Sequence, residues 1–140
     1  MKILIAADGS DYTKRMLAYL AAHDEWLGGA HAYTVLTVSP AVPARAAAVI
    51  DRDTLKGYYA DAAEAVFKPI RAFFKKQNIA AEFVAKVGHA PEVIGKVADA
   101  KDFDLLLMGS HGHGAIGNLV MGSVVTKVLA SCKTPVLIVR

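Results

Sequence analysis

The stretch LLLMGSHGHGAIGNLVMGSV, residues 105–124, sets the fold that the sequence predicts. An apolar run at 105–108 stops at Gly109, further glycines follow at positions 112, 114, 117 and 122, and an apolar-periodic segment then runs from Ser123 to about residue 130. This pattern predicts a buried strand, a glycine-rich loop and a helix. Glycine lets backbone N–H groups approach a ligand closely, and the start of a helix offers unpaired donors with a partial positive charge. The stretch therefore predicts a site for a phosphate group.

The loop in this stretch lacks formal charge, because residues 109–123 include no Asp, Glu, Lys or Arg. An anion bound there must be held by backbone donors, by the hydroxyls of Ser110 and Ser123, and by His111 and His113. Phosphoryl transfer needs cations on the leaving phosphates and a group that positions the nucleophile. The loop supplies neither, so we assign no catalytic residue and expect at most weak hydrolysis of a bound phosphate compound.

Strands alternate with helices along the rest of the chain. The predicted strands are residues 2–7, 32–38, 82–87, 105–108 and 136–140. A first helix is predicted after Ser10, and three more are predicted at 54–77, with a bend at Pro69, at 90–100 and at 123–130. The connection 39–53 is expected to hold at most a short helical turn. This rhythm predicts one doubly wound α/β domain over residues 1–140, with a mainly parallel five-stranded sheet and helices on both faces. Ligands of such sheets bind beyond the carboxyl ends of the strands, where Asp8 and the Gly109 loop lie.

Composition excludes several classes of function. Apolar residues make up 54% of the 140 residues, but no apolar run approaches the roughly 20 residues that a membrane helix needs. The first residues lack the apolar core of a secretory signal and are interpreted as the first strand. A single cysteine, Cys132, predicts a reducing, cytoplasmic setting, with that residue in a structural role. The net charge of +3 is spread along the chain, so nucleic-acid binding is not expected.

The glycine spacing also carries a family resemblance. The pattern consists of Gly109-x-x-Gly112, nine further residues and then Gly122-Ser123. It resembles the nucleotide-binding signature of the universal stress protein family, in its ATP-binding branch. Further similar blocks in the same order extend the resemblance over nearly the whole chain: KILIAADGS, HAYTVLTVSP, VGHAPEVI, DLLLMGSHG and TPVLIVR. Neither a Walker sequence nor a G-x-G-x-x-G after the first strand is present, so a P-loop or Rossmann site is not supported.

The resemblance implies strand order 3-2-1-4-5 and a bound ATP, with Mg²⁺ as a companion of the phosphates. It implies that the triphosphate is wrapped by Gly109, Gly112, Gly122 and Ser123, with Ser110 and Val124 in the same pattern. Asp8 is then expected at the adenosine end, and the backbone of Val38 at the adenine. His113 stands where many relatives have arginine, and histidine is charged only when protonated, so we expect affinity to depend on pH. No third ligand accompanies His111 and His113, and no metal site is predicted.

The last strand points to a partner. An apolar strand at a sheet edge invites aggregation unless it is paired or covered, and the resemblance implies a homodimer through residues 136–139. The expected function is a regulatory or stress-protective module that binds ATP. Two alternatives remain open: a nucleotide-free dimer of the same fold that acts as a protein-interaction scaffold, and a flavodoxin-like carrier with FMN on the turn at residues 9–13, which predicts a yellow protein.

Overall fold

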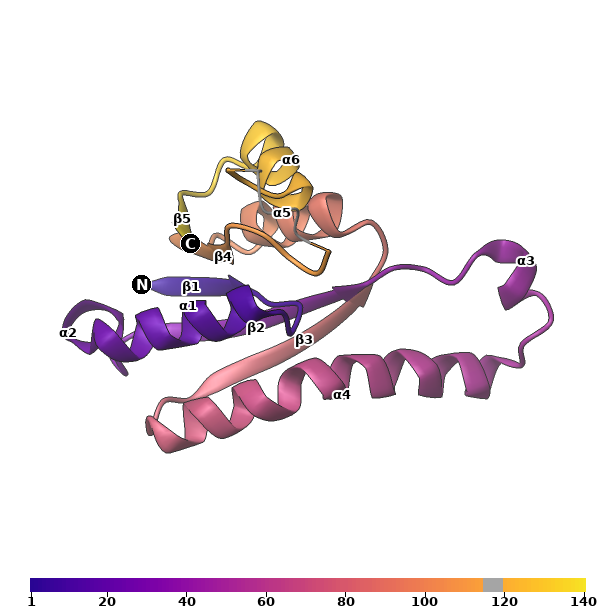
Figure 1. Ribbon diagram of the computed structural model, residues 1–140, viewed down its shortest axis with the longest axis horizontal. Helices are drawn as coiled ribbons and strands as arrows, with labels where there is room; N and C mark the ends of the chain where they lie inside the picture. The colour runs from indigo at the N-terminus through magenta and orange to yellow at the C-terminus, as the bar shows by residue number, and fades with distance from the viewer. Residues whose placement is uncertain (115–119) are drawn as a thin grey trace.

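Five parallel strands form the centre of the protein, in the order β3-β2-β1-β4-β5 (Figure 1). The computed structural model describes residues 1–114 and 120–140. The strands are β1 (Lys2–Ala6), β2 (Ala32–Ser39), β3 (Ala81–Val87), β4 (Leu105–Gly109) and β5 (Val136–Val139). The central strand β1 pairs with β2 on one side and with β4 on the other. The predicted sheet, its order and its doubly wound architecture are therefore confirmed.

Helices cover both faces of this sheet. One face carries α1 (Asp11–Ala22), α2 (Asp24–Leu27) and α4 (Arg52–Lys76), and the other carries α5 (Ala90–Ala100) and α6 (Ser123–Ser131). Because successive strand residues point to opposite faces, Ile3 and Ile5 pack in the first core and Leu4 packs in the second. This two-sided burial explains why the central strands β1 and β4 consist almost entirely of apolar residues. Among the described residues, no helix combines the length and the apolar character needed to cross a membrane.

The longest helix, α4, begins two residues before the predicted start. Asp51 precedes it and accepts hydrogen bonds from the backbone N–H and the hydroxyl of Thr54, at 2.9 and 2.6 Å. This capping interaction stabilises the first turn, so the helix starts at Arg52. The helix continues through Pro69, as its apolar stripe predicts.

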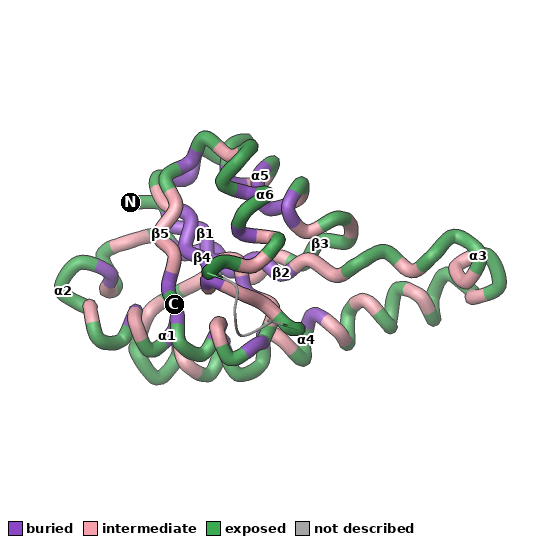
Figure 2. The backbone as a smooth tube through the Cα atoms, turned by 45° about the horizontal axis from the view of Figure 1, so that its top comes forward, coloured by how far each residue is buried: buried purple, intermediate pink, exposed green. Residues whose placement is uncertain are grey.

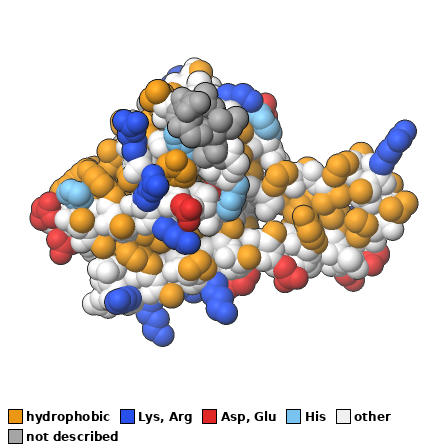
Figure 3. Space-filling view, viewed as in Figure 1, with side chains coloured by type: hydrophobic (Ala, Val, Ile, Leu, Met, Phe, Trp, Pro, Cys, Tyr) orange, Lys and Arg blue, Asp and Glu red, His pale blue; other side chains and the backbone are white. Residues whose placement is uncertain are grey.

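The first part of α4 and the short helix α3 (Ala44–Ala47) form an arm, residues 40–62, that projects beyond the sheet (Figures 1 and 2). Every residue of the arm is at least partly exposed, and the buried residues of α4 begin at Ala63. Apolar side chains are spread over the arm (Figure 3), with Val49 86% and Tyr58 59% exposed. The hydroxyl of Tyr59 accepts the N–H of Val42 at 2.7 Å and links the two sides of the arm.

Asp99, at the end of α5, fixes the connection between α6 and β5. Its Oδ1 accepts the hydroxyl and N–H of Thr134 at 2.8 and 3.0 Å and the N–H of Lys133 at 3.1 Å. The thiol of Cys132 also donates to it, at 3.3 Å, and burial raises the pKa of that thiol. These bonds hold α6 against α5, which positions the start of α6 beside the site described below.

We expect Asp99 to stabilise the fold in a pH-dependent way. The hydroxyl of Thr134, followed by the N–H of Lys133, lowers the pKa of Asp99 from 3.8 to about 2. A carboxylate whose pKa is lower in the folded state than in the unfolded state stabilises the fold at pH values above its unfolded-state pKa. This stabilisation is lost as the pH falls through the folded-state pKa. Asp99→Ala should therefore lower the free energy of unfolding at neutral pH, and its difference from wild type should shrink as pH falls from about 4 towards 2. Denaturant unfolding of both proteins at several pH values measures this difference, and a difference that stays constant down to the lowest pH contradicts the assignment.

Candidate functional site

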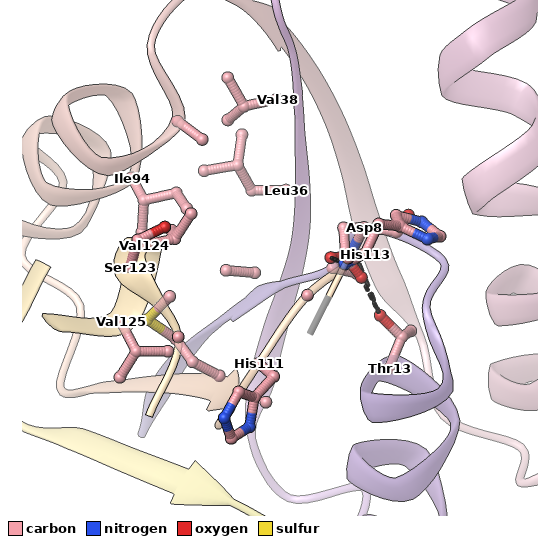
Figure 4. A pocket seen from close by; sticks show the side chains of 18 of the residues that line it. Asp8, Thr13, Leu36, Val38, Ile94, His111, His113, Ser123, Val124 and Val125 are labelled. Atoms are coloured by element: carbon pink, nitrogen blue, oxygen red, sulfur yellow. Dashed lines mark hydrogen bonds between the residues drawn. The ribbon is translucent and has the colours of Figure 1, made fainter. Parts of the chain in front are cut away.

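A pocket of about 570 Å³ lies at the carboxyl ends of β1, β2 and β4. It lies where the strand order reverses, since the chain moves from β1 to β2 on one side and later to β4 on the other. Doubly wound sheets bind their ligands at this position. Figure 4 shows a polar end, with Asp8, Thr13 and His113, and an apolar end, with Leu36, Val38 and Ile94.

The turn after β1 builds the polar end around Asp8. Its Oδ1 accepts the N–H of Ser10 at 2.9 Å and the hydroxyl of Thr13 at 3.1 Å. The Thr13 hydroxyl in turn accepts the N–H groups of Asp8 and Gly9, both at 3.2 Å. Gly9 has φ +79°, which favours glycine. One oxygen of the carboxylate is thus committed to the turn, and Asp8 is held in a fixed orientation.

Asp8 also holds the loop that follows β4. The backbone N–H of His113 donates to its Oδ2 at 3.3 Å, and the Nε2 of His113 donates to its carbonyl oxygen at 2.7 Å. Because a carbonyl can only accept, this contact places the ring hydrogen of His113 on Nε2. The loop after β4 and the turn after β1 therefore form one wall of the pocket.

The three spaced glycines stand where the backbone passes very close to other atoms. A Cβ at Gly109 would lie 2.7 Å from the Cβ of Tyr12, and a Cβ at Gly112 would lie 2.5 Å from the Oδ2 of Asp8. A Cβ at Gly122 would lie 3.2 Å from the Cα of His111. The first contact is with α1, the second with the turn after β1, and the third is within the loop. The spacing thus has a packing reason at every glycine, whichever ligand the pocket holds.

The start of α6 supplies backbone donors to the pocket. Gly122 precedes the helix, and Ser123 and Val124 are its first residues, all of them lining the pocket. The N–H groups of a first helical turn have no partner within the helix and carry a partial positive charge. The pocket therefore combines a donor-rich helix start with an apolar wall, an arrangement that suits an anionic group attached to a flat apolar one.

All but one of the sequence-predicted site residues line this pocket. The exception is Ser110, which is 1% exposed and lies behind the loop. Its N–H donates to the carbonyl of Val139, its carbonyl accepts the N–H of Gly122 at 2.7 Å, and its hydroxyl lies 2.9 Å from the Nδ1 of His111. Ser110 is therefore placed to shape the loop. The predicted phosphate loop also includes residue 117, which lies outside the described residues.

Sequence reasoning did not include several lining residues. Thr13, Leu36, Pro40 and Ile94 line the pocket but were not predicted as site residues. Leu36, Pro40 and Ile94 lie within the blocks HAYTVLTVSP and VGHAPEVI, and Leu36 could have been found as a residue near the carboxyl end of a strand beside β1. Lys127, one turn into α6, and His89, just before α5, do not line the pocket. Within residues 1–114 and 120–140, no group of three or more His, Cys, Asp or Glu could hold a metal ion.

Comparison with known proteins identifies the family of this chain. The sequence model of the universal stress protein family matches residues 1–140. This chain belongs to that family. A universal stress protein of Thermus aquaticus is 31% identical over 149 aligned positions, which cover 99% of this chain and 97% of that protein. The Synechocystis protein Slr1230 is 42% identical over 66 residues, and the match spans 47% of this chain and 23% of Slr1230.

Solved structures agree with this family fold. The structure of the MJ0577 protein has a TM-score of 0.78 and 24% identity, covering 99% of this chain and 94% of that one. A universal stress protein in complex with cAMP has a TM-score of 0.64 and 23% identity, covering 100% and 96%. A family protein of Arabidopsis thaliana with AMP bound has a TM-score of 0.71 and 14% identity, covering 99% and 90%. At these identities the similarity establishes the fold, and some proteins with this fold bind adenine nucleotides.

Proposed function

We propose that this universal stress protein binds an adenine nucleotide in the pocket beside β1, with ATP as the ligand that the glycine spacing implies. The observation that carries the proposal is the position of the pocket, which joins the helix start at Ser123, the fixed carboxylate of Asp8 and the apolar wall at Leu36 and Ile94. The helix start suits the phosphates, the carboxylate of Asp8 suits the ribose hydroxyls or an exocyclic amine, and the apolar wall suits the base. The relatives with bound cAMP and AMP support the same ligand class.

We further propose that the bound nucleotide is a signal that partners read, with slow or negligible hydrolysis. Asp8 is the one carboxylate among the described pocket residues, and its Oδ1 is committed to the turn after β1. The described lining includes no Lys or Arg to stabilise a leaving phosphate. Turnover of about 1 per second or more, as in ordinary kinases, would contradict this part of the proposal.

Nucleotide release tests whether the pocket is occupied in the cell. The protein is purified without added ligand and denatured, and any adenine nucleotide is identified by chromatography, with Gly122→Val prepared in parallel. We expect nucleotide in the wild type and its loss in the variant, because a side chain at Gly122 would press on His111 and Ser110. A wild type without nucleotide that also fails to bind added Mg-ATP, ADP or AMP favours the alternative of a nucleotide-free scaffold.

We also propose a cytoplasmic homodimer paired through β5. The carbonyls of Pro135 and Val139 accept hydrogen bonds from the β4 side. Strand alternation then turns the N–H groups of Val136 and Ile138 away from β4. These outward groups would pair with a second copy, which solves the problem of an apolar sheet edge.

Hydrogen exchange tests this dimer. The amides of Val136 and Ile138 are expected to exchange more slowly as protein concentration rises, while sedimentation reports twice the monomer mass. The amides of Leu137 and Val139 face β4 and serve as internal controls, since they should be protected at every concentration. A monomer at all concentrations, with rapid exchange at the two outward amides, contradicts the dimer.

A further inference from the structure

We infer that the pocket ranks nucleotides by their phosphate charge. It binds a nucleotide with a single phosphate group, or a triphosphate whose charge Mg²⁺ offsets, more tightly than it binds free ATP. The inference rests on the proposed function, because it concerns the same pocket. The positive charge that the pocket offers comes from backbone N–H groups alone, and these groups suit a ligand of small negative charge.

The charges that line the pocket support this ranking. Its ionisable side chains, among the residues that the structure describes, are Asp8, His111 and His113. The rest of the loop adds no cation, because residues 109–123 contain no Lys or Arg in the sequence. A phosphate monoester carries a charge of about −1.5 to −2 at neutral pH, and a triphosphate carries more. A helix start contributes only about half of an elementary positive charge, so the described pocket and the loop sequence leave most of a triphosphate's charge without a counter-charge.

The side chains at the polar end do not supply the missing cation. Asp8 is itself negative, and its Oδ2 lies close to the loop backbone at Gly112. His113 uses its Nε2 hydrogen to donate to the carbonyl of Asp8 at 2.7 Å. The Nδ1 of His111 lies 2.9 Å from the hydroxyl of Ser110. Histidine, unlike arginine, carries no permanent charge, so these side chains give the polar end no fixed cation beside a ligand.

The nearby cations Arg15 and Lys127 do not line the pocket. The guanidinium of Arg15 lies 4.8 Å from the ring centre of Tyr12, and that ring lies 5.0 Å from the ring of His111. The ring of Tyr12 thus contacts both Arg15 and His111, and Arg15 itself does not line the pocket. Lys127 is exposed on α6 and does not line the pocket. Because no described Lys or Arg lines the pocket, we expect the cation that meets a triphosphate to arrive with the ligand, as Mg²⁺ does.

Titration calorimetry at about pH 8, where an ordinary histidine is neutral, tests the ranking. The folded protein is titrated with AMP, with ATP plus a chelator, and with ATP plus Mg²⁺. We expect the affinity for AMP to be at least about tenfold higher than the affinity for free ATP, because like charges a few ångströms apart repel. Mg²⁺ should reduce this difference in affinity. His113→Arg should tighten the binding of free ATP about tenfold and the binding of AMP less. Gln77→Arg, at the far end of α4, adds the same charge at the opposite end of the sheet and should leave the ranking unchanged.

Each outcome decides a separate question. Free ATP that binds the wild type as tightly as AMP overturns the inference and leaves the proposed function standing. An affinity ranking that does not change in folded His113→Arg also overturns it. Failure of the folded wild type to bind any of these nucleotides overturns the proposed function itself. The comparison with and without Mg²⁺ uses the wild type, so it stands even if a variant does not fold.

Discussion

Gly112→Ala is expected to weaken adenine nucleotide binding about tenfold or more while leaving the fold intact. A Cβ at this position would lie 2.5 Å from the Oδ2 of Asp8, so the carboxylate must move. Its movement disturbs the bonds that Asp8 makes to Ser10, Thr13 and the N–H of His113. The wall between the turn after β1 and the loop after β4 then loses its shape. Calorimetric titration with AMP and with Mg-ATP measures the loss.

Gly57→Ala is the matched control for this substitution. Gly57 lies in the exposed first part of α4, where a Cβ would meet nothing within 4 Å. Alanine in an exposed helix is about 1 kcal/mol more favourable than glycine, so this variant should bind nucleotide as the wild type does and melt at a slightly higher temperature. Equal affinities of Gly112→Ala and Gly57→Ala would show that the close approach at Gly112 has no part in binding.

Asp8→Ala is the second substitution with a large expected effect. It removes the acceptor for the Ser10 N–H, the Thr13 hydroxyl and the His113 N–H together. It also removes the carboxylate that we propose to contact the nucleoside. Hydrogen bonds to charged groups contribute about 1.5–3 kcal/mol each, so a loss of about 10- to 100-fold in affinity is expected even if the turn relaxes in part.

Asp11→Ala provides the control for Asp8→Ala. Asp11 is the first residue of α1, and its side chain is 82% exposed in an ion pair with Lys14. Exposed pairs of this kind contribute little to stability. Calorimetry and thermal melting of both variants separate a lost ligand contact from a general loss of negative charge near α1. Wild-type affinity in a folded Asp8→Ala protein contradicts the role assigned to Asp8.

The fold could be predicted largely from apolar pattern and turn residues. Strands buried on both faces are short runs of Ile, Leu and Val, and Ile3, Leu4 and Ile5 show how a single run serves two cores. The start of α4 was missed although Asp51 and Thr54 carry a capping signal. The short helix α3 could not be placed, because four residues leave no helical period to detect.

The site was predictable in its residue types and less so in its contacts. The spacing of Gly109, Gly112 and Gly122 indicates a tight loop, but the atoms that require glycine belong to Tyr12, Asp8 and the loop itself. Those partners follow from tertiary packing, which no local pattern reveals. Ser110 illustrates the same limit, since its place in the motif does not show that its side chain is buried behind the loop.

Nucleotide binding in the pocket beside β1 is tested most directly by amide chemical shifts during titration with AMP. The backbone N–H groups of Gly112, Ser123 and Val124 are expected to shift and saturate together, because these residues line the pocket and we propose that they hold the phosphate. Amides of the arm, such as those of Val49 and Gly57, should stay unchanged. Shifts that saturate elsewhere in the chain, or no shifts at all in the folded protein, would contradict the site.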